Sequence, residues 1–279
     1  MLSRVLADRL ADRLGQPFVV ENKAGASGAI GAEFVARAAP DGYTLLTAPT
    51  SVYAVGTALN SKMPFDLQKD LAPISTVGIT EQSLNVTAAL PVTSLAELIA
   101  YAKARPRLLN MASQGSGTVS HLACAMLAGQ AGIEFLHVPY KGSVQAITDL
   151  VSGNVQVMCD SIAASLPQIR AGKLRALAVV GARRSTQLPD VPTVGEAALP
   201  GFKVESWTGV MLAAGAPRPV VERLQQEIVR VIAEPAVQKR LGDAGFRLQS
   251  SSQEAFAQLI RDDLTQWAAA VKATGATAD

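Results

Sequence analysis

The chain is poor in aromatic and charged residues and has no block of charge of one sign. Aromatic residues make up 5% of its 279 positions and charged residues 17%, whereas 49% are hydrophobic. Aliphatic side chains must therefore build most of the core, and the chain is too apolar to be largely disordered. Its length suffices for two domains of ordinary size or one large α/β domain. The 25 basic and 23 acidic residues are spread along the chain, which argues against binding to nucleic acid.

Cysteine and histidine are scarce, which limits metal chemistry. The two cysteines, Cys124 and Cys159, lie far apart and form no CxxC motif. The two histidines, His121 and His137, complete no ligand spacing, so the sequence predicts no metal site. We expect the cysteines to be buried free thiols, with a single disulfide as the alternative.

Long apolar runs are also missing. No run approaches the ~18 residues that a membrane span needs. The first residues carry aspartate and arginine every few positions, so they do not resemble the apolar core of a secretory signal. They predict instead an amphipathic helix that ends at Gly15 and has one leucine stripe, formed by Leu2, Leu6, Leu10 and Leu14.

Strand-like apolar runs alternate with helical periodicity in both halves of the chain. Short loops separate them, which favours parallel sheets with helices on both faces. Two of the predicted helices are expected to bury Ile30, Phe34 and Ala38, and Val144, Ile147 and Val151. The predicted strands cover residues 18–20, 43–47, 74–77, 84–87, 108–112, 133–138, 155–158, 174–180 and 204–212.

No clean linker separates the two halves. The helices near the C-terminus need a sheet to cover, so we expect one domain to be inserted into the other. Residues 1–85 and 204–279 are predicted to form a discontinuous first lobe, and residues 86–203 an inserted second lobe.

Four loops follow predicted strands at the edge where open α/β sheets bind ligands, namely residues 48–51, 114–118, 140–143 and 160–161. They offer small residues, hydroxyls and backbone N–H groups beside helix starts, which favours an anion such as a carboxylate. Each also has a structural interpretation. The glycines of 25–31 and 115–117 can be simple turns, His121 and Asp160 can cap helices, and Trp207 is either core or a wall near the crossing segments.

No catalytic arrangement can be identified. The segment Gly115–Ser120 lacks the third glycine of a dinucleotide-binding GxGxxG motif, and the acidic residue expected after the next strand is absent. The chain has neither a P-loop nor the GxSxG motif of a serine hydrolase. The sequence therefore predicts no cofactor and no enzyme.

A series of ordered segments runs through nearly the whole chain: VVENKAGASGAIGAE (19–33), ARAAPDGYTLL (36–46), MPFD (63–66), GSG and SHLA (115–117 and 120–123), HVPYKG (137–142), GKLRALAV (172–179), LPDVPT (188–193) and LPGF (199–202). Together they resemble the tripartite tricarboxylate transporter receptor family, also called Bug or TctC-like proteins. The resemblance implies a periplasmic solute-binding protein of the two-lobed, type II periplasmic-binding-protein-like α/β fold, with two doubly wound sheets joined by crossing strands.

Several functional expectations come from this resemblance. Such a protein would be a monomer that closes over a small carboxylate (a di- or tricarboxylate, an amino acid or an aromatic acid) and delivers it to membrane transporter subunits. The alternatives are a ligand sensor that signals to a membrane partner and an enzyme that acts on a carboxylate. Mapped onto this chain, the predicted ligand contacts are Thr50, Ser51, Ser116, Gly117, Thr118, His121, Tyr140, Asp160 and Ser161.

The beginning of the chain departs from the family pattern. Family members start with a signal peptide, a first strand and a glycine-rich loop, whereas here Met1 falls where an internal residue would be expected. We therefore expect the first strand of lobe 1 to be missing, through a start placed too far downstream or a truncated product.

Overall fold

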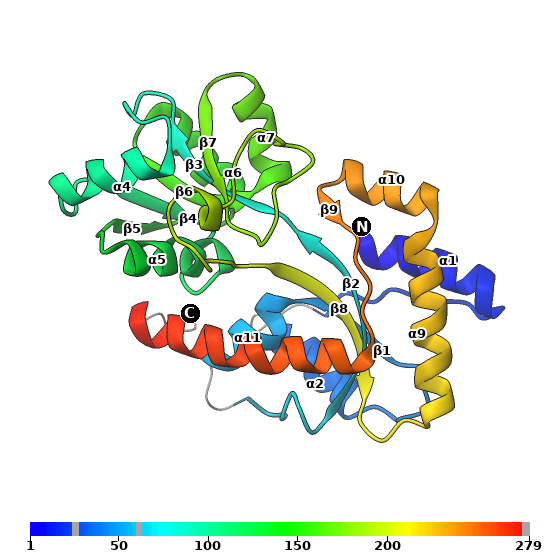
Figure 1. The fold of residues 1–279 in the computed structure, drawn as a ribbon. Coiled ribbons are helices and arrows are strands. Elements are labelled where there is room, and N and C mark those ends of the chain that lie inside the picture. The colour runs from blue at the N-terminus through cyan, green and yellow to red at the C-terminus, as the bar shows by residue number, and fades with distance from the viewer. Residues whose placement is uncertain (24–27, 60–62, 275–279) are drawn as a thin grey trace. The chain divides into compact units, whose positions relative to one another are not determined.

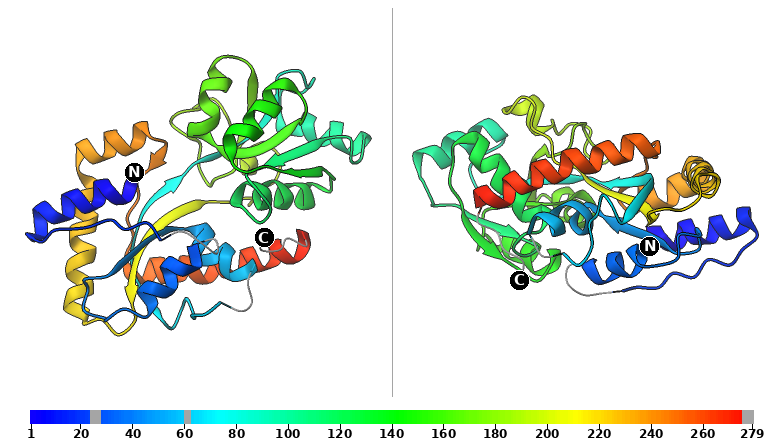
Figure 2. Two further views of the ribbon diagram at one scale, coloured as in Figure 1. Left: turned by 180° about the vertical axis from the view of Figure 1, so that it is seen from behind. Right: turned by 90° about the horizontal axis from the view of Figure 1, so that it is seen from below.

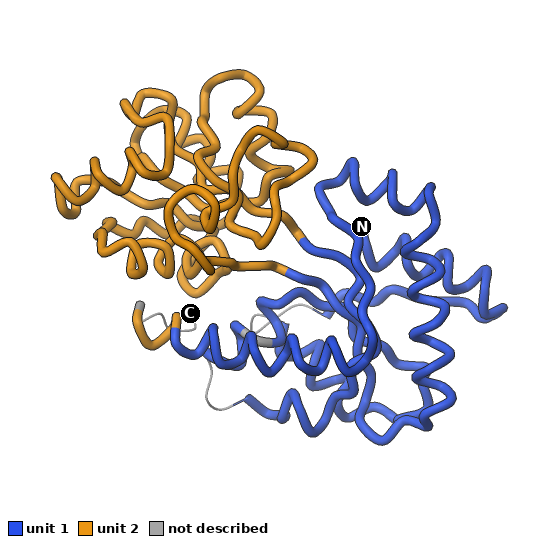
Figure 3. The backbone as a smooth tube through the Cα atoms, in the orientation of Figure 1, with its two compact units in different colours: residues 1–79, 207–269 blue, residues 80–206, 270–279 orange. Residues whose placement is uncertain are grey.

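The computed structural model describes residues 1–23, 28–59 and 63–274. It divides the chain into two compact units, one made of residues 1–79 and 207–269 and the other of residues 80–206 and 270–279 (Figure 3). The boundaries fall at 79/80 and 206/207, whereas the sequence placed them at 85/86 and 203/204. They lie at the end of strand β2, Leu71–Thr80, and the start of strand β8, Ser206–Ala213, where the sequence carries no break.

Unit 1 contains a four-stranded sheet in the order β1-β8-β2-β9 (Figure 1). Strand β1 spans Leu45–Pro49 and β9 spans Phe246–Arg247. Strands β1 and β8 are antiparallel, with Leu45 opposite Leu212. The sheet is therefore not purely parallel as the alternation of elements predicted, because β8 enters it from a distant part of the sequence.

Helices cover both faces of this sheet (Figures 1 and 2). Alternate residues of β8 separate the two cores, since Val210 and Leu212 pack with one set of helices and Trp207 and Met211 with the other. The first set consists of α1 (Leu2–Leu14), α9 (Arg218–Ala233) and α10 (Pro235–Asp243). The second set includes α2 (Ala29–Ala36), the π-helix η2 (Ser51–Val55) and α11 (Gln253–Thr274). The short helix α3 (Gly56–Leu59) follows η2 directly.

Two expectations for the first unit are wrong. Residues 18–20 form no strand, and Val19 is 90% exposed, because an apolar triplet without a partner strand has no ladder to join. Helix α2 buries Ala29, Ala32 and Val35 instead of Ile30 and Phe34. Apolar residues lie on two sides of this helix, so either side could face the core. The side that does so carries the small side chains of Ala29 and Ala32. The glycine-rich stretch 25–31 lies partly outside the described residues.

Unit 2 contains a five-stranded sheet in the order β5-β4-β6-β3-β7. Strand β4 pairs in parallel with β5 and β6, whereas β3 is antiparallel to β6 and β7. The carboxyl ends of β5, β4 and β6 therefore lie at one edge of the sheet. The strands are β3 (Gln82–Thr87), β4 (Asn110–Ser113), β5 (Leu136–Pro139), β6 (Val157–Ser161) and β7 (Leu174–Val179).

Each of the three parallel strands leads into a helix, through a short loop after β4 and β5 and directly after β6. Helix α6 buries Ala146 and Leu150, while Val144 is 80% exposed. The predicted inward stripe of α6 is therefore wrong at Val144, because the helix turns Ala146 and Leu150 toward the core, and Ile147 and Val151 lie partly buried beside them. The helices of this unit are α4 (Leu95–Ala104), α5 (Val119–Ala131), α6 (Ser143–Ser152), α7 (Ile162–Arg170) and α8 (Val194–Ala197).

Within the described ranges, no helix combines the length and the apolar character needed to cross a membrane.

Candidate functional site

Two loops and the end of strand β6 meet at the carboxyl edge of the unit 2 sheet, and one buried carboxylate joins them. Oδ1 of Asp160, at the end of β6, accepts from Nε2 of Gln114 at 2.5 Å, from Oγ of Ser143 at 3.0 Å and from the backbone N–H of Ser161 at 2.8 Å. Gln114 directly follows β4, and Ser143 is the first residue of α6. Asp160 thus links the β4–α5 and β5–α6 loops to its own strand.

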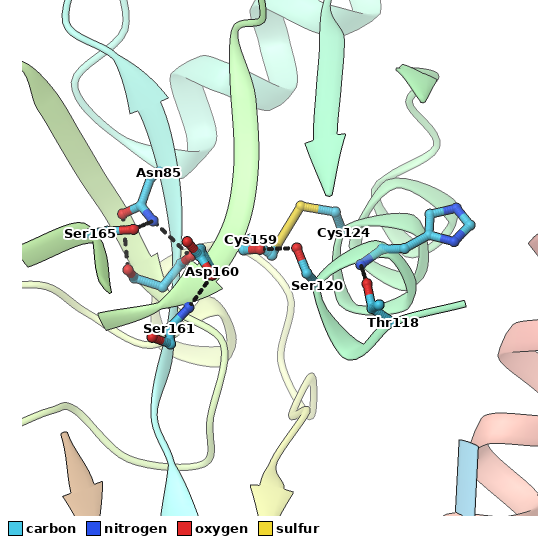
Figure 4. The surroundings of a disulfide bond; sticks show 10 residues. Asn85, Thr118, Ser120, Cys124, Cys159, Asp160, Ser161 and Ser165 are labelled. Atoms are coloured by element: carbon cyan, nitrogen blue, oxygen red, sulfur yellow. Dashed lines mark hydrogen bonds between the residues drawn. A yellow bond between two sulfur atoms is a disulfide. The ribbon is translucent and has the colours of Figure 1, made fainter. Parts of the chain in front are cut away.

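Asp160 is completely buried. Burial raises the pKa of its carboxyl group, and the hydrogen bonds that it accepts from Gln114, Ser161 and Ser143 oppose that rise. Two buried polar side chains lie beside this carboxylate, and Nδ2 of Asn85 donates to Oγ of Ser165 (Figure 4). Its burial and its protein donors make Asp160 a residue that holds loops in place.

The β4–α5 loop is held from inside by Thr118 and His121. Oγ1 of Thr118 caps α5 by accepting from the backbone N–H of His121 at 3.3 Å, and it donates to the carbonyl of Gly115 at 2.8 Å. The N–H of Gly117 donates to Nδ1 of His121 at 3.1 Å. The backbone N–H of Ser116 has no partner among the described residues, so it remains available to a ligand.

The two histidines of the chain are stacked on each other. The rings of His121 and His137 lie 3.8 Å apart at 5°, and Nε2 of His137 is 2.7 Å from Oγ of Ser113. Burial, with a smaller effect of His137, lowers the pKa of His121 to about 4, and burial also lowers the pKa of His137. Both rings are therefore neutral near pH 7, as the acceptor role of His121 Nδ1 requires. No cluster of three or more potential metal ligands occurs in the part of the chain that the structure describes.

Helix α6 begins differently from its two neighbours. Thr118 caps α5, and Oγ of Ser161 caps α7 by accepting from the N–H of Ala164 at 3.2 Å. The residue before α6 is Gly142, with φ 111°, which has no side chain to serve as a cap. Its first-turn N–H groups therefore have no acceptor among the described residues, which makes this helix start a place for an anion.

Tyr140 precedes this helix start, but its hydroxyl is directed elsewhere. The Tyr140 hydroxyl donates to Oδ2 of Asp149 at 2.6 Å. Burial and this neighbouring carboxylate raise the pKa of Tyr140 to about 12. The structure thus brings the loop residue to the predicted edge with its hydroxyl already bonded to α6.

A disulfide between Cys124 and Cys159 connects α5 with β6, next to Asp160 (Figure 4). The expectation of two free thiols is wrong. Packing of α5 against the sheet brings the two Cα atoms to 5.7 Å, within the usual range for a disulfide. The hydroxyl of Ser120 donates to the carbonyl of Cys159, which adds a second link between the same two elements.

The unit 1 residues expected at the site lie in a different setting. Thr50 is completely buried, and its hydroxyl both donates to the carbonyl and accepts from the N–H of Trp207, each at 3.0 Å. Trp207 is 1% exposed and stacks on Tyr53 at 5.3 Å, so it belongs to the core of unit 1. Ser51 is half-buried at the start of η2.

The structure brings the predicted loops of unit 2 together at one sheet edge, but the sequence did not point to two of the side chains that connect them. Gln114 and Ser143 were treated only as loop positions, although each immediately follows a strand or starts a helix. This position, next to a strand end or at a helix start, was the feature of the sequence that could have identified them as site residues. Their bonds to Asp160 depend on strand order, which periodicity does not reveal.

Comparisons with known proteins point to one family. The family model described as tripartite tricarboxylate transporter family receptor matches residues 2–276. Among solved structures, the chain is similar to R. palustris Rpa4515 with adipate, with a TM-score of 0.83, 33% identity and coverage of 99% of this chain and 93% of that one. It is similar to MatC (Rpa3494) from Rhodopseudomonas palustris with bound malate, with a TM-score of 0.78, 33% identity and coverage of 97% and 93%.

A third similar structure is that of periplasmic binding protein BugD, with a TM-score of 0.78, 33% identity and coverage of 99% of this chain and 93% of that one. These likenesses extend over nearly the full chain on both sides. They confirm the expected two-lobed, periplasmic-binding-protein-like α/β fold.

Proposed function

Because the chain belongs to the tripartite tricarboxylate transporter receptor family, we propose that it is a solute-binding protein that captures a small organic carboxylate for membrane transporter subunits. Two solved relatives hold adipate and malate, both of which are dicarboxylates. Their ligands support the ligand class proposed here. The protein would act by binding and release, without a catalytic step.

The observation that carries this proposal is the uncapped start of α6 beside the network of Asp160. First-turn N–H groups and the helix dipole both favour a carboxylate, and Ser116 offers a further free N–H on the neighbouring loop. Each charge-assisted hydrogen bond contributes about 1.5–3 kcal/mol. Micromolar binding needs about 8 kcal/mol, so a handful of such contacts is enough after ordering costs.

The predicted contact residues differ in the hydrogen bonds that they already make within the protein. Ser116 and Ser161 are half-buried, with Ser161 capping α7, and we propose that they border the ligand. Gly117, Thr118 and His121 would shape the loop through their mutual hydrogen bonds. Contacts from the remaining predicted residues, Thr50, Ser51, Tyr140 and Asp160, stay predictions from the sequence.

We place the protein in the periplasm, as a monomer. The Cys124–Cys159 disulfide supports an oxidising compartment, since such bonds are rare in the reducing cytosol. The solved relative BugD is a periplasmic binding protein.

A thermal-shift screen of the purified protein against a panel of carboxylates tests the proposal. The panel contains adipate, malate, citrate, aspartate and benzoate, each paired with the compound in which every carboxylate is replaced by a neutral amide. A carboxylate at 100 times its Kd should add about 2.7 kcal/mol to the free energy of unfolding. No shift with any carboxylate, or equal shifts with the amides, would contradict carboxylate binding.

A further inference from the structure

We propose that Asp160 sets the ligand specificity of this site by fixing which end of the Gln114 side-chain amide faces the ligand. The site then selects carboxylates that carry a hydrogen-bond donor, a hydroxyl or an ammonium group, on the carbon next to the bound carboxylate. This inference rests on the proposed function, because it concerns the same site.

Both hydrogens of the Gln114 side-chain amide are already donated within the protein. A side-chain amide nitrogen has two hydrogens. In Gln114 one is donated to Oγ of Ser143 at 2.9 Å and the other to Oδ1 of Asp160 at 2.5 Å. The hydroxyl of Ser143 in turn donates to the same Asp160 oxygen at 3.0 Å. Every hydrogen in this triangle therefore points toward Asp160 or is passed on to it.

Asp160 fixes the orientation of the Gln114 side-chain amide. Oδ1 of Asp160 acts as an acceptor for three donors, since the backbone N–H of Ser161 donates to the same oxygen as Gln114 and Ser143. If the Gln114 amide turned over, its carbonyl oxygen would face the carboxylate and no proton would lie between them. Such an unpaired contact in a buried place is unfavourable, so the NH2 end stays with Asp160.

The carbonyl end of Gln114 is what remains for a ligand. No group of the described residues donates to Oε1, and the Gln114 side chain is half-buried. Ser143, bonded to Gln114, is the first residue of α6 and so belongs to the turn with the free N–H groups. The start of α6 with its free N–H groups and the acceptor Oε1 of Gln114 thus lie next to each other. A 2-hydroxy or 2-amino carboxylate offers the matching pair of groups.

Matched ligands that differ at one oxygen test the specificity. The probes are 2-hydroxyglutarate against 2-oxoglutarate, and lactate against pyruvate, measured by calorimetry with both enantiomers of each hydroxy acid. Wild-type protein should bind one enantiomer of a hydroxy acid about tenfold more tightly than the matching oxo acid, because only the hydroxyl can donate to Oε1 of Gln114. Equal affinities, or tighter binding of the oxo acid, would overturn the inference.

Two variants separate the roles of the residues. Gln114→Met removes the acceptor at nearly the same size, so the hydroxy-to-oxo ratio should fall to about one. Asp160→Asn can present either a donor or an acceptor to Gln114, so the amide is no longer held in one orientation and the ratio should also fall. A ratio that Asp160→Asn leaves unchanged would remove Asp160 from the account, and one that Gln114→Met leaves unchanged would remove Gln114.

The melting temperature of each variant reports folding separately from specificity. A purely structural role would lower affinity for both members of a pair and keep their ratio. If none of the carboxylates binds wild-type protein, the proposed function fails. If hydroxy and oxo acids bind equally well, the function stands and only this specificity inference fails.

Discussion

His121 is the residue on which the shape of the β4–α5 loop depends most directly. Its neutral ring accepts the N–H of Gly117, and protonation of Nδ1 would replace that acceptor with a donor. The stacked ring of His137 makes a charge on His121 still less favourable. The loop beside the candidate site is therefore built for a neutral imidazole.

A pH dependence of stability follows from this depressed pKa. The unfolded chain protonates His121 near its ordinary value of 6.5, whereas the folded protein does so only at about 4. Stability is therefore complete above about pH 6.5 and falls as the pH is lowered toward 4, where the unfolded state binds more protons. We expect a loss on the order of 2 kcal/mol, measured by urea unfolding between pH 7 and pH 4.

The variant His121→Asn provides the control, because its Oδ1 can take the place of Nδ1 as an acceptor without titrating. Its stability should change less between pH 7 and pH 4 than that of the wild type. Identical pH profiles for the two proteins would show that His121 is not the titrating group.

At single positions, the sequence indicated where a residue lies on its strand or helix but not which groups its side chain contacts. Asp160 was expected near a ligand because it ends a strand, and the structure places it at that strand end, fully buried among protein donors. Thr50 likewise follows a strand, but its hydroxyl bonds the backbone of Trp207. The side chains of Asp160 and Thr50 both contact residues that are distant in sequence, and local sequence patterns do not specify such contacts.

In the proposed function, anion binding depends on the start of helix α6. Val144 lies in its first turn and is 80% exposed, so substitutions there should leave the fold intact. Val144→Glu places a negative charge beside the free N–H groups, where it competes with a ligand carboxylate. We expect affinity to fall by about 1 kcal/mol, roughly fivefold, in calorimetric titrations at low salt.

Val144→Gln is the matched control for the Glu variant, since it has the same shape without the charge. It should bind nearly as tightly as the wild type, and added salt should narrow the difference between the two variants. Equal affinity of both variants at low salt would move the anion site away from α6.

The disulfide joins two elements, α5 and β6, whose ends both border the site. It closes a loop with a sequence separation of 35, and chain-entropy arguments give such a cross-link about 2–4 kcal/mol of stability. Replacing both cysteines, Cys124→Ala with Cys159→Ala, should lower the denaturant midpoint accordingly. The double variant should no longer respond to a reducing agent that lowers the midpoint of the wild type. A wild-type midpoint insensitive to full reduction would contradict this role.

Element types were easier to predict than element orientations. Amphipathic helices were recognised where one apolar stripe dominates, as in α1 with Leu6 and Leu10. In α2 both stripes are apolar, so the sequence could not tell that Val35 and not Phe34 faces the core. Residues 18–20 look like a strand but form none, because strand formation requires a partner that local sequence does not specify.

At the scale of the whole molecule, the order of segments was the strongest signal. Motifs such as HVPYKG (137–142) and GKLRALAV (172–179) occur in order along the chain, and the family model matches residues 2–276. The alternation of elements predicted an α/β protein but not the mixed sheets, since antiparallel pairs such as β3 with β6 arise from long-range pairing. Resemblance therefore gave the architecture, whereas the edge at which a ligand binds stays a prediction from residue chemistry.

Isothermal titration calorimetry of the purified wild-type protein with a carboxylate and its uncharged amide tests whether the chain binds a small organic carboxylate through its charge. The carboxylate should be the one that gives the largest thermal shift. The account predicts saturable binding of one molecule per chain with micromolar or tighter affinity, and binding of the amide weaker by at least about tenfold, because only the carboxylate carries the charge that the α6 start favours. Absence of saturable binding by any carboxylate, or equal affinity for the amide, would contradict it.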